Sequence, residues 1–253
     1  MAATNGSGNT RKNYYSVSYG KLSTRVKEFP ENSEEIKESD LKSLIKDVEN
    51  IDLRNRHIVK TGDYPYVAFY DKIEGYIRSI DLNDSQHGKS LNIEILDTDD
   101  EVSIIQIRMY SKYTENLLNR LCNLKDFNKL VTFTPYAIPS SFEGENGAKI
   151  KLYNQGVSIR VEGEKLDITF ASDNKDLPKV ERITDSNGKE TTSRVKRINF
   201  LFDTVSDLFN KFLSDTVGTE KNAVEKSKDA STEDNAPVVN TNDSDVDEDD
   251  LPF

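Results

Sequence analysis

Apolar and polar residues alternate along the middle of the chain, which is the pattern of β-strands that bury one face. The alternation predicts a long strand at Tyr66–Ile80, followed by strands at Leu91–Leu96 and Val102–Tyr110. Two more are predicted at Leu130–Ile138 and Ala148–Tyr153. Polar, Asp-rich stretches separate the first three strands and indicate turns. The centre of the chain is therefore predicted to form five strands.

Three segments change to the three- and four-residue spacing of amphipathic helices. One follows the third predicted strand at Thr114–Leu124, and another covers residues 33–50, where Ser33 before two glutamates suits a helix start. The third covers residues 198–213. Because apolar stripes usually face a core, we expect this last helix to pack on the body, with a dimer or partner helix as the alternative.

The predicted order of three strands, a helix and two strands is that of an OB-fold, a partly open Greek-key barrel. Additional hairpins are expected at residues 157–170 and 180–196. Tyr14–Phe29 is rich in β-formers and either joins the barrel or pairs with another subunit. The predicted class is mainly β with helices (α+β): an OB-fold-like five-stranded barrel with additional hairpins, flanking helices and a disordered acidic C-terminal tail.

Charge is distributed unevenly along the chain. The net charge is −11, but residues 219–253 hold eleven of the acids and only three lysines. The rest of the chain is close to balance, so the low isoelectric point mostly describes the C-terminus and does not argue against a nucleic-acid partner. Residues 1–13 and 218–253 are predicted to be disordered, and residues 14–217 to form the folded domain.

Composition excludes several classes of protein. A single cysteine, Cys122, leaves no disulfide framework and no cysteine-based metal site. We expect Cys122 to be a small buried residue of the predicted helix. No apolar run is long enough for a membrane span, and the polar N-terminus lacks a signal core. The sequence predicts a soluble intracellular protein.

Catalytic motifs are scarce. The segment NDSQHGKS resembles the end of a phosphate-binding loop, but Asn83 stands at the first glycine position and a strand follows. The carboxylates of Asp97–Glu101 lie in one predicted turn, whereas a two-metal site needs acids from separate elements. We therefore predict no enzyme activity, no cofactor and no metal.

The acidic C-terminus is the most specific motif. Acidic residues precede three apolar ones at the chain end, in the order Asp247, Glu248, Asp249, Asp250, Leu251, Pro252, Phe253. This tip resembles that of single-stranded DNA-binding proteins (SSBs), the bacterial family and its phage analogues, in which several aspartates precede an aliphatic residue and Pro-Phe. The likeness covers about nine residues, and the size of the body is closer to that of a phage replication SSB. The alternative is an acidic solubilising tail.

Physical chemistry supports that likeness. A terminal Phe on a flexible tether can enter an apolar pocket of a partner while its carboxylate meets a basic residue at the rim. The preceding acids can also compete with nucleic acid for the protein's own basic groove. The resemblance implies binding to single-stranded DNA without strong sequence preference. It also implies recruitment of replication and recombination proteins (polymerase, primase or helicase) in the bacterial cytoplasm, in the setting of phage infection.

Tyrosines interleaved with basic residues are the second signal, because rings stack on bases and cations follow phosphates. Near the N-terminus these are Tyr14, Tyr15, Tyr19, Lys21 and Arg25. In an OB-fold, the exposed face of strands 2–3 and two loops form the site. The predicted DNA-binding residues are Lys72, Tyr76, Arg78, His87, Lys89, Asn92, Gln106, Arg108, Tyr110, Phe142, Lys149, Lys151 and Tyr153. Ordinary packing at a core or strand edge is the alternative for each tyrosine.

Two other functions remain open. An OB-like adaptor could use the tip as a docking peptide without any affinity for DNA. A DNA-processing nuclease is less favoured, because no set of carboxylates converges in the sequence pattern. The oligomeric state is also open, and an oligomer is compatible with the sequence.

Overall fold

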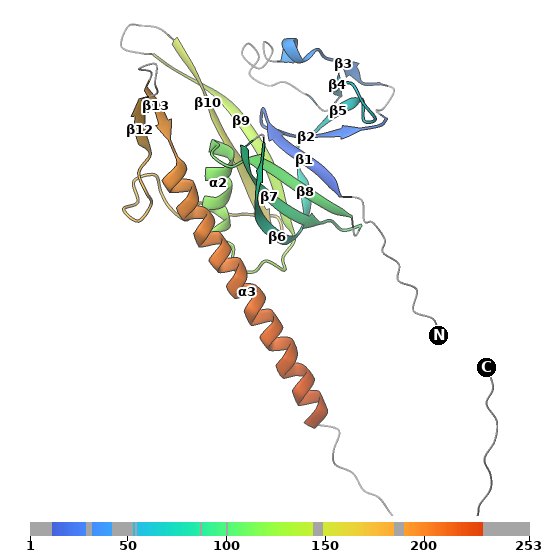
Figure 1. Cartoon of the computed structure of the whole chain (residues 1–253), viewed down its shortest axis with the longest axis vertical. Helices are drawn as coiled ribbons and strands as arrows, with labels where there is room; N and C mark the ends of the chain where they lie inside the picture. The colour runs from blue at the N-terminus through green and yellow to red at the C-terminus, as the bar shows by residue number, and fades with distance from the viewer. Residues whose placement is uncertain are drawn as a thin grey trace, which may run out of the picture. The chain divides into compact units, whose positions relative to one another are not determined.

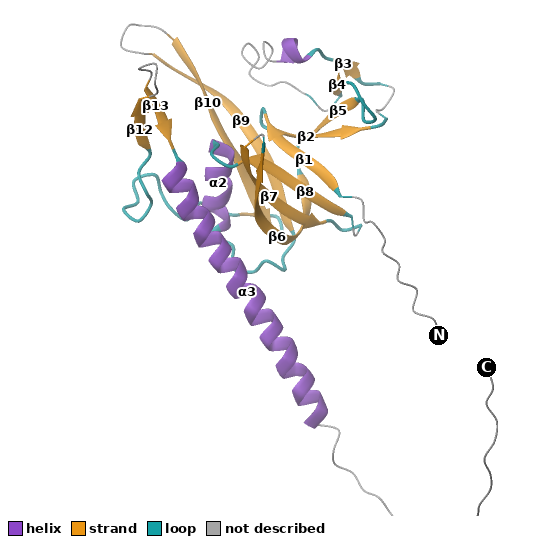
Figure 2. Cartoon of the chain, in the orientation of Figure 1, coloured by secondary structure: helices purple, strands orange, loops and turns teal. Residues whose placement is uncertain are grey.

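A computed structural model describes residues 12–28, 32–41, 53, 55–86, 88–99, 101–143, 149–184 and 190–229. Side chains are described in these ranges except at 139–143, 149–153, 190–191 and 217–229. The protein is mainly β with a few helices, as predicted (Figure 2). None of the helices described is long and apolar enough to cross a membrane.

One large sheet contains eleven of the described strands, in the order β11-β10-β9-β6-β7-β8-β1-β2-β5-β4-β3 (Figure 1). Its N-terminal strands are β1 (Asn13–Ser18), β2 (Lys21–Val26), β3 (Glu34–Glu35), β4 (Arg56–Val59) and β5 (Tyr66–Tyr70). Its other strands are β6 (Ile73–Ser85), β7 (Gly88–Leu96), β8 (Val102–Arg108), β9 (Val131–Glu143), β10 (Lys149–Val161) and β11 (Glu164–Lys165). A separate hairpin pairs β12 (Glu181–Thr184) with β13 (Glu190–Ser193).

Strand β6 connects two parts of the sheet. Its first residues, Ile73–Gly75, pair with β9, whereas the residues from Tyr76 onward pair with β7. A β-bulge at Arg78 shifts the register between these neighbours. Gly75 fits where β6 passes close to β7, since a Cβ there would lie 2.4 Å from the carbonyl oxygen of Leu96. The bulge and the glycine together allow one strand to serve both neighbours.

The five predicted central strands are adjacent in the sheet, in the order β8-β7-β6-β9-β10. A closed barrel would also need β8 to pair with β10. Instead, the second edge of β8 pairs in parallel with β1, with Tyr14 opposite Ile104 and Ser16 opposite Gln106. The predicted five-stranded barrel is therefore not shown, and the N-terminal strand pairs within its own chain.

The β1–β2 hairpin ends in a tight turn at Tyr19 and Gly20. Both residues have positive φ, 54° and 74° respectively, as a type I′ turn requires. The turn lies on β9, because a Cβ at Gly20 would be 2.5 Å from the backbone nitrogen of Ala137. The N–H of Gly20 donates a 2.8 Å hydrogen bond to the Tyr113 hydroxyl. The hairpin turn is thus held between a strand and a helix.

Two helices pack on the large sheet around one core. Helix α2 (Lys112–Leu121) is capped by Ser111, whose side chain accepts from the Thr114 N–H. Helix α3 (Val195–Asp229) buries one stripe, as predicted for residues 198–213. Its fully buried members are Ile198, Leu201 and Val205. The helix continues past residue 218, where the predicted tail begins.

A smaller apolar cluster lies under the N-terminal strands, formed by Ile36, Leu41, Leu53, Ile58 and Phe69. The predicted helix start at Ser33 is wrong, because Glu34–Glu35 forms β3 and pairs in parallel with β4. The Ser33 hydroxyl instead lies 2.8 Å from Nδ1 of His57. A helical turn covers residues 38–41, and residues 42–50 lie outside the described part of the chain.

Several predicted strand limits also need correction. The single strand predicted at Tyr66–Ile80 is two strands, β5 and β6, separated at Asp71 and Lys72. The stretch predicted as a polar turn before Leu91 mostly extends the β6–β7 hairpin. Residues 157–161 are the end of β10, which forms a short hairpin with β11, whereas the strand predicted at 166–170 is wrong because no strand covers those residues. The hairpin predicted at 180–196 is confirmed as β12–β13.

Candidate functional site

One face of the sheet around β7, β8 and β1 is polar. In the register, Asn92 lies opposite Gln106, and Gln106 lies opposite Ser16 on the next strand. Alternate residues of β8, Ile105 and Ile107, turn into the core and are about 1% exposed. Period-two alternation therefore gathers the amide and hydroxyl side chains of three strands on the outer face.

A groove of about 760 Å³ lies on this face. It is lined by Ser16, Val17, Ser18, Tyr19, Asn83, Ser85, Gly88, Lys89, Ser90, Gln106, Arg108, Ser111, Tyr113 and Gln155. We call it the main groove. Its floor is partly fixed, because the Gln106 side chain donates to the Ser90 hydroxyl at 3.2 Å. Residues from β1, β6, β7, β8, α2 and β10 meet there, so the groove forms only in the folded chain.

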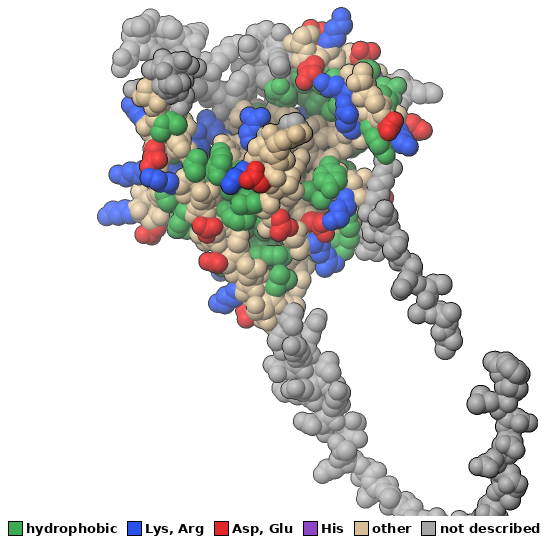
Figure 3. All heavy atoms as spheres, in the orientation of Figure 1, with side chains coloured by type: hydrophobic (Ala, Val, Ile, Leu, Met, Phe, Trp, Pro, Cys, Tyr) green, Lys and Arg blue, Asp and Glu red, His purple; other side chains and the backbone are tan. Residues whose placement is uncertain are grey.

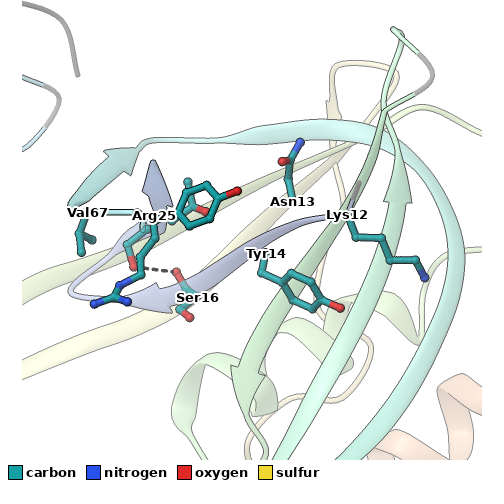
Figure 4. Close-up of a pocket in the computed structure, with 9 residues that line it drawn as sticks. Lys12, Asn13, Tyr14, Ser16, Arg25 and Val67 are labelled. Atoms are coloured by element: carbon teal, nitrogen blue, oxygen red, sulfur yellow. Dashed lines mark hydrogen bonds between the residues drawn. The ribbon is translucent and has the colours of Figure 1, made fainter. Parts of the chain in front are cut away.

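A second cavity, of about 530 Å³, adjoins the main groove through Ser16, which lines both. We call it the Tyr14 pocket, and its lining is Lys12, Asn13, Tyr14, Ser16, Ser23, Thr24, Arg25, Tyr64 and Val67. Figure 4 shows the side chains of Lys12, Tyr14 and Arg25 around it. The two cavities together follow β1 along its length.

The charge of the two linings differs from that of the whole chain. Lys89 and Arg108 line the main groove, and Lys12 and Arg25 line the Tyr14 pocket. Among the described residues that line either cavity there is no Asp or Glu. On the face shown in Figure 3, acidic and basic side chains are interspersed. An acidic protein thus has a local basic path along β1.

Two of these four cations have acidic partners outside the cavity linings. Lys12 forms a 2.6 Å ion pair with Glu94, and this hydrogen bond raises the pKa of Lys12. Lys89 lies 3.7 Å from Asp84. Both lysines are substantially exposed, so these pairs exchange readily with other anions. The Arg108 guanidinium is exposed and has no ion-pair partner within the described residues.

Tyrosine rings accompany the cations. Tyr14 is 55% exposed and Tyr19 is 37% exposed, so both offer an accessible ring face. Tyr19 lines the main groove. Its backbone is in the left-handed conformation, which is unfavourable for a residue with a Cβ. Tyr113 lines the same groove but is buried, and burial raises the pKa of its hydroxyl. Its role is structural.

Three predicted binding residues meet in the main groove: Lys89, Gln106 and Arg108. Asn92 is beside them on the same face, half-buried and opposite Gln106. Tyr110 follows β8 and is 41% exposed, but it does not line the groove. The structure therefore brings together four residues predicted around the second and third central strands.

The residues predicted on the first central strand lie elsewhere. Lys72, Tyr76 and Arg78 are exposed, yet none lines either cavity. Tyr76 pairs with Leu96, whereas Lys89 pairs with Asp84 at the other end of the same hairpin. At about 3.3 Å per residue, Tyr76 and Asp84 on β6 are roughly 26 Å apart. These three side chains do not belong to the main groove.

Other predicted residues fall outside the described set. His87 is one, and so is the whole tip at residues 247–253. The backbones of Phe142, Lys149, Lys151 and Tyr153 belong to β9 and β10, but their side chains are not described. Their part in binding stays a prediction.

Five residues that line the two cavities are not among the predicted DNA-binding residues: Lys12, Tyr14, Tyr19, Arg25 and Tyr64. Four of the five lie at or near the N-terminal hairpin, where interleaved tyrosines and bases were the available signal. The sequence pattern does not reveal that β1 pairs with β8, which is what brings these residues to the site. Tyr15 and Lys21, from the same stretch, are not in the site: Tyr15 packs on the core, and Lys21 pairs with Asp71.

Parts of the segments that resemble catalytic motifs lie among the described residues. Strand β7 begins at Gly88, as expected for a hairpin. The Asp97 carboxylate accepts from the N–H groups of Asp99 and Glu101, which makes it a turn residue. Burial raises the pKa of Cys122 to about 12. No cluster of three or more potential metal ligands occurs among the described residues.

Comparisons with protein-family models, with curated proteins and with solved structures gave no match to this chain.

Proposed function

We propose that the protein binds single-stranded DNA along β1, in the main groove and the Tyr14 pocket, without strong sequence preference. The supporting observation is the lining of these two adjoining cavities, which combines Tyr14 and Tyr19 with four cations and, among the described lining residues, no carboxylate. Single-stranded nucleic acid needs this combination, because bases stack on rings while cations follow the phosphates.

The chemistry of the two cavities suits a strand of any sequence. Arg108 and Lys89 are exposed and can follow a phosphate without loss of a buried partner. Asn92, Gln106 and Ser16 offer donors and acceptors to whichever base edges approach. The binding energy then comes from stacking and from release of counterions, and it weakens as salt is added.

The topology around β6 supports an OB-like reading of the central strands. Three antiparallel strands precede α2 and two follow it, and β6 pairs with both groups through a bulge. In that reading, β7 and β8 are the second and third strands, whose exposed face is the usual ligand face of the fold. The proposed path along β1 would widen that face by one parallel strand.

The acidic tip supplies the second half of the proposal. Its sequence, from Asp247 to Phe253, suits insertion of the terminal Phe into a pocket of a replication or recombination protein. Its acids suit competition with DNA for the basic path when no DNA is bound. The bacterial, phage-infected setting comes from the resemblance of this tip alone.

A titration tests the proposal. Fluorescent oligothymidylate is titrated at two salt concentrations with the full chain and with a chain that lacks residues 219–253. We expect binding by both, weaker in high salt, and tighter for the chain without the tail. Absence of binding by both chains overturns the proposal and favours a protein-interaction adaptor. Mg²⁺-dependent loss of the oligonucleotide would favour a nuclease.

A further inference from the structure

A third cavity, of about 260 Å³, lies between α2, α3 and β10. We call it the α2–α3 pocket. Its polar lining includes Lys112, Glu115, Asn154, Gln155, Arg194 and Arg197. It contains no residue predicted from the sequence to bind DNA. Its basic residues lie at or just before the N-terminal ends of two helices that are distant in the chain.

The lining of this pocket contains three cations and one carboxylate. Glu115 forms ion pairs with Arg194 at 2.8 Å and with Arg197 at 3.0 Å. Lys112 is exposed, and no ion pair of Lys112 occurs in the described residues. One carboxylate cannot neutralise two guanidinium groups and an ammonium, so the lining keeps a positive excess. An anion is the ligand that this excess favours.

The guanidinium groups keep hydrogen-bonding capacity for such a ligand. Arg197 is held in place, since Nε donates to the Pro178 carbonyl and one terminal nitrogen donates to Glu115. The Nε atom of Arg194 is buried and makes no hydrogen bond within the described residues, although it lies close to Glu115. Each guanidinium has five donors, so a phosphate oxygen can be added without displacing Glu115.

The pocket adjoins the main groove. Gln155 of β10 lines both cavities. At the start of α2, Ser111 and Tyr113 line the main groove, while Lys112 between them lines the α2–α3 pocket. A strand that leaves the main groove beside Gln155 therefore enters the α2–α3 pocket next.

We propose that the α2–α3 pocket binds a backbone phosphate of the same DNA strand and extends the binding path beyond the sheet face. This proposal rests on the proposed function, because the strand must first occupy the main groove. The path then runs from the Tyr14 pocket past Ser16 into the main groove and past Gln155 to the helices. A longer oligonucleotide is needed to reach the last cavity.

A purely structural role is the competing explanation for the charged cluster. The ion pairs of Glu115 join α2 to the start of α3 and stabilise that contact. The test therefore leaves Glu115, Arg194 and Arg197 unchanged. It uses Lys112 and Ser172, both exposed in the pocket lining and neither needed for the ion pairs.

The experiment measures affinity for oligothymidylates from about 4 to about 30 nucleotides, which brackets the usual range for one OB-type domain. The variants are Lys112→Gln, which removes a cation, and Ser172→Glu, which adds a carboxylate to the pocket. Their matched controls are Lys211→Gln and Ser39→Glu, at exposed positions that line none of the three cavities. Thermal unfolding of each variant checks that the fold is retained.

For the longest oligonucleotides, we expect Lys112→Gln to reduce the slope of log affinity against log salt by about 0.7, the value for one phosphate contact on a single strand. Ser172→Glu should lower affinity for them by up to about fivefold, as expected for one exposed charge. The shortest oligonucleotides should bind all variants equally.

The possible outcomes separate the two proposals. If wild type binds but both pocket variants match their controls at every length, the extension is overturned and the proposed function stands. The extension is also overturned if the variants weaken short and long oligonucleotides equally, because the pocket would then act through the fold. If wild type binds no oligonucleotide of any length, both proposals fail.

Discussion

The hydroxyl of Tyr113 accepts a hydrogen bond from the buried N–H of Gly20, across 93 positions of the sequence and at 2.8 Å. Helix α2 thereby holds the turn of the β1–β2 hairpin. The same turn presents Tyr19 to the main groove. A contact between a helix and a backbone amide consequently fixes one wall of the candidate site.

Tyr113→Phe should destabilise the protein without changing its shape. The substitution leaves the Gly20 N–H buried and without an acceptor, which costs about 1–3 kcal/mol. The expected result is a loss of that size in the free energy of unfolding, measured by denaturant titration. Tyr110→Phe is the control, because Tyr110 is exposed and should change stability by less than about 0.5 kcal/mol. Equal stability of both variants would contradict the role given to this hydrogen bond.

Tyr19→Gly should separate stability from binding. Glycine adopts the left-handed conformation of this position without steric cost, so the free energy of unfolding should stay constant or rise by about 1 kcal/mol. Loss of the ring should lower affinity for oligothymidylate about 5- to 150-fold, the equivalent of one base stack. Tyr19→Phe keeps the ring and should bind as wild type. Wild-type affinity of the glycine variant would remove Tyr19 from the binding path.

The local elements could be predicted because their pattern is visible in the sequence. Alternation identified β7, β8 and β9, since each buries every second residue against the core. The break at Asp71–Lys72 was missed because apolar residues continue on both sides of it. The start of β3 was missed because Ser33 and two glutamates also suit a helix N-terminus. Tertiary pairing with β4 decided the conformation there.

The candidate site depends on non-local pairing, which no local pattern contains. Lys89, Gln106 and Arg108 could be predicted, because a hairpin of neighbouring strands brings them together. Tyr14 could not be assigned, since its strand pairs in parallel with β8, a strand about 90 residues later in the chain. The bulge at Arg78 and the length of the hairpin separate Tyr76 from the groove.

The Cys122 thiol should be inert in the folded protein. Burial raises its pKa to about 12, and its sulfur lies 3.9 Å from the Leu201 carbonyl oxygen at the contact between α2 and α3. At about pH 8 the thiolate fraction is then on the order of 1 in 10,000, so reaction with a thiol reagent should be slow. Unfolding in denaturant should expose the thiol and give rapid, complete labelling. Fast labelling of the folded protein would contradict the protection expected from the partial burial of Cys122.

Deletion of Phe253 alone should leave affinity for oligothymidylate nearly unchanged, because the acids of the tail remain. Removal of residues 219–253 should tighten DNA binding by relieving competition for the basic path. In contrast, if the tip binds a replication protein as proposed, a peptide of the last ten residues should lose that binding when Phe253 is absent, measured with purified polymerase, primase and helicase. If loss of Phe253 changed DNA affinity as much as loss of the whole tail, the two roles would not be separable.

Arg108→Gln should weaken DNA binding through a phosphate contact. The guanidinium is exposed, lines the main groove and has no ion-pair partner among the residues described, so its removal leaves no buried charge behind. We expect lower affinity at low salt, a salt slope smaller by about 0.7 and little dependence on base sequence. The free energy of unfolding should stay within about 0.5 kcal/mol of wild type.

Arg182→Gln is the matched control, because Arg182 lies on the separate hairpin and in none of the cavity linings. It should change neither the affinity for DNA nor the salt slope. An unchanged salt slope for Arg108→Gln would remove Arg108 from the phosphate path and leave Lys89 as the lysine or arginine of the main groove, in the described part of the chain, that could contact a phosphate.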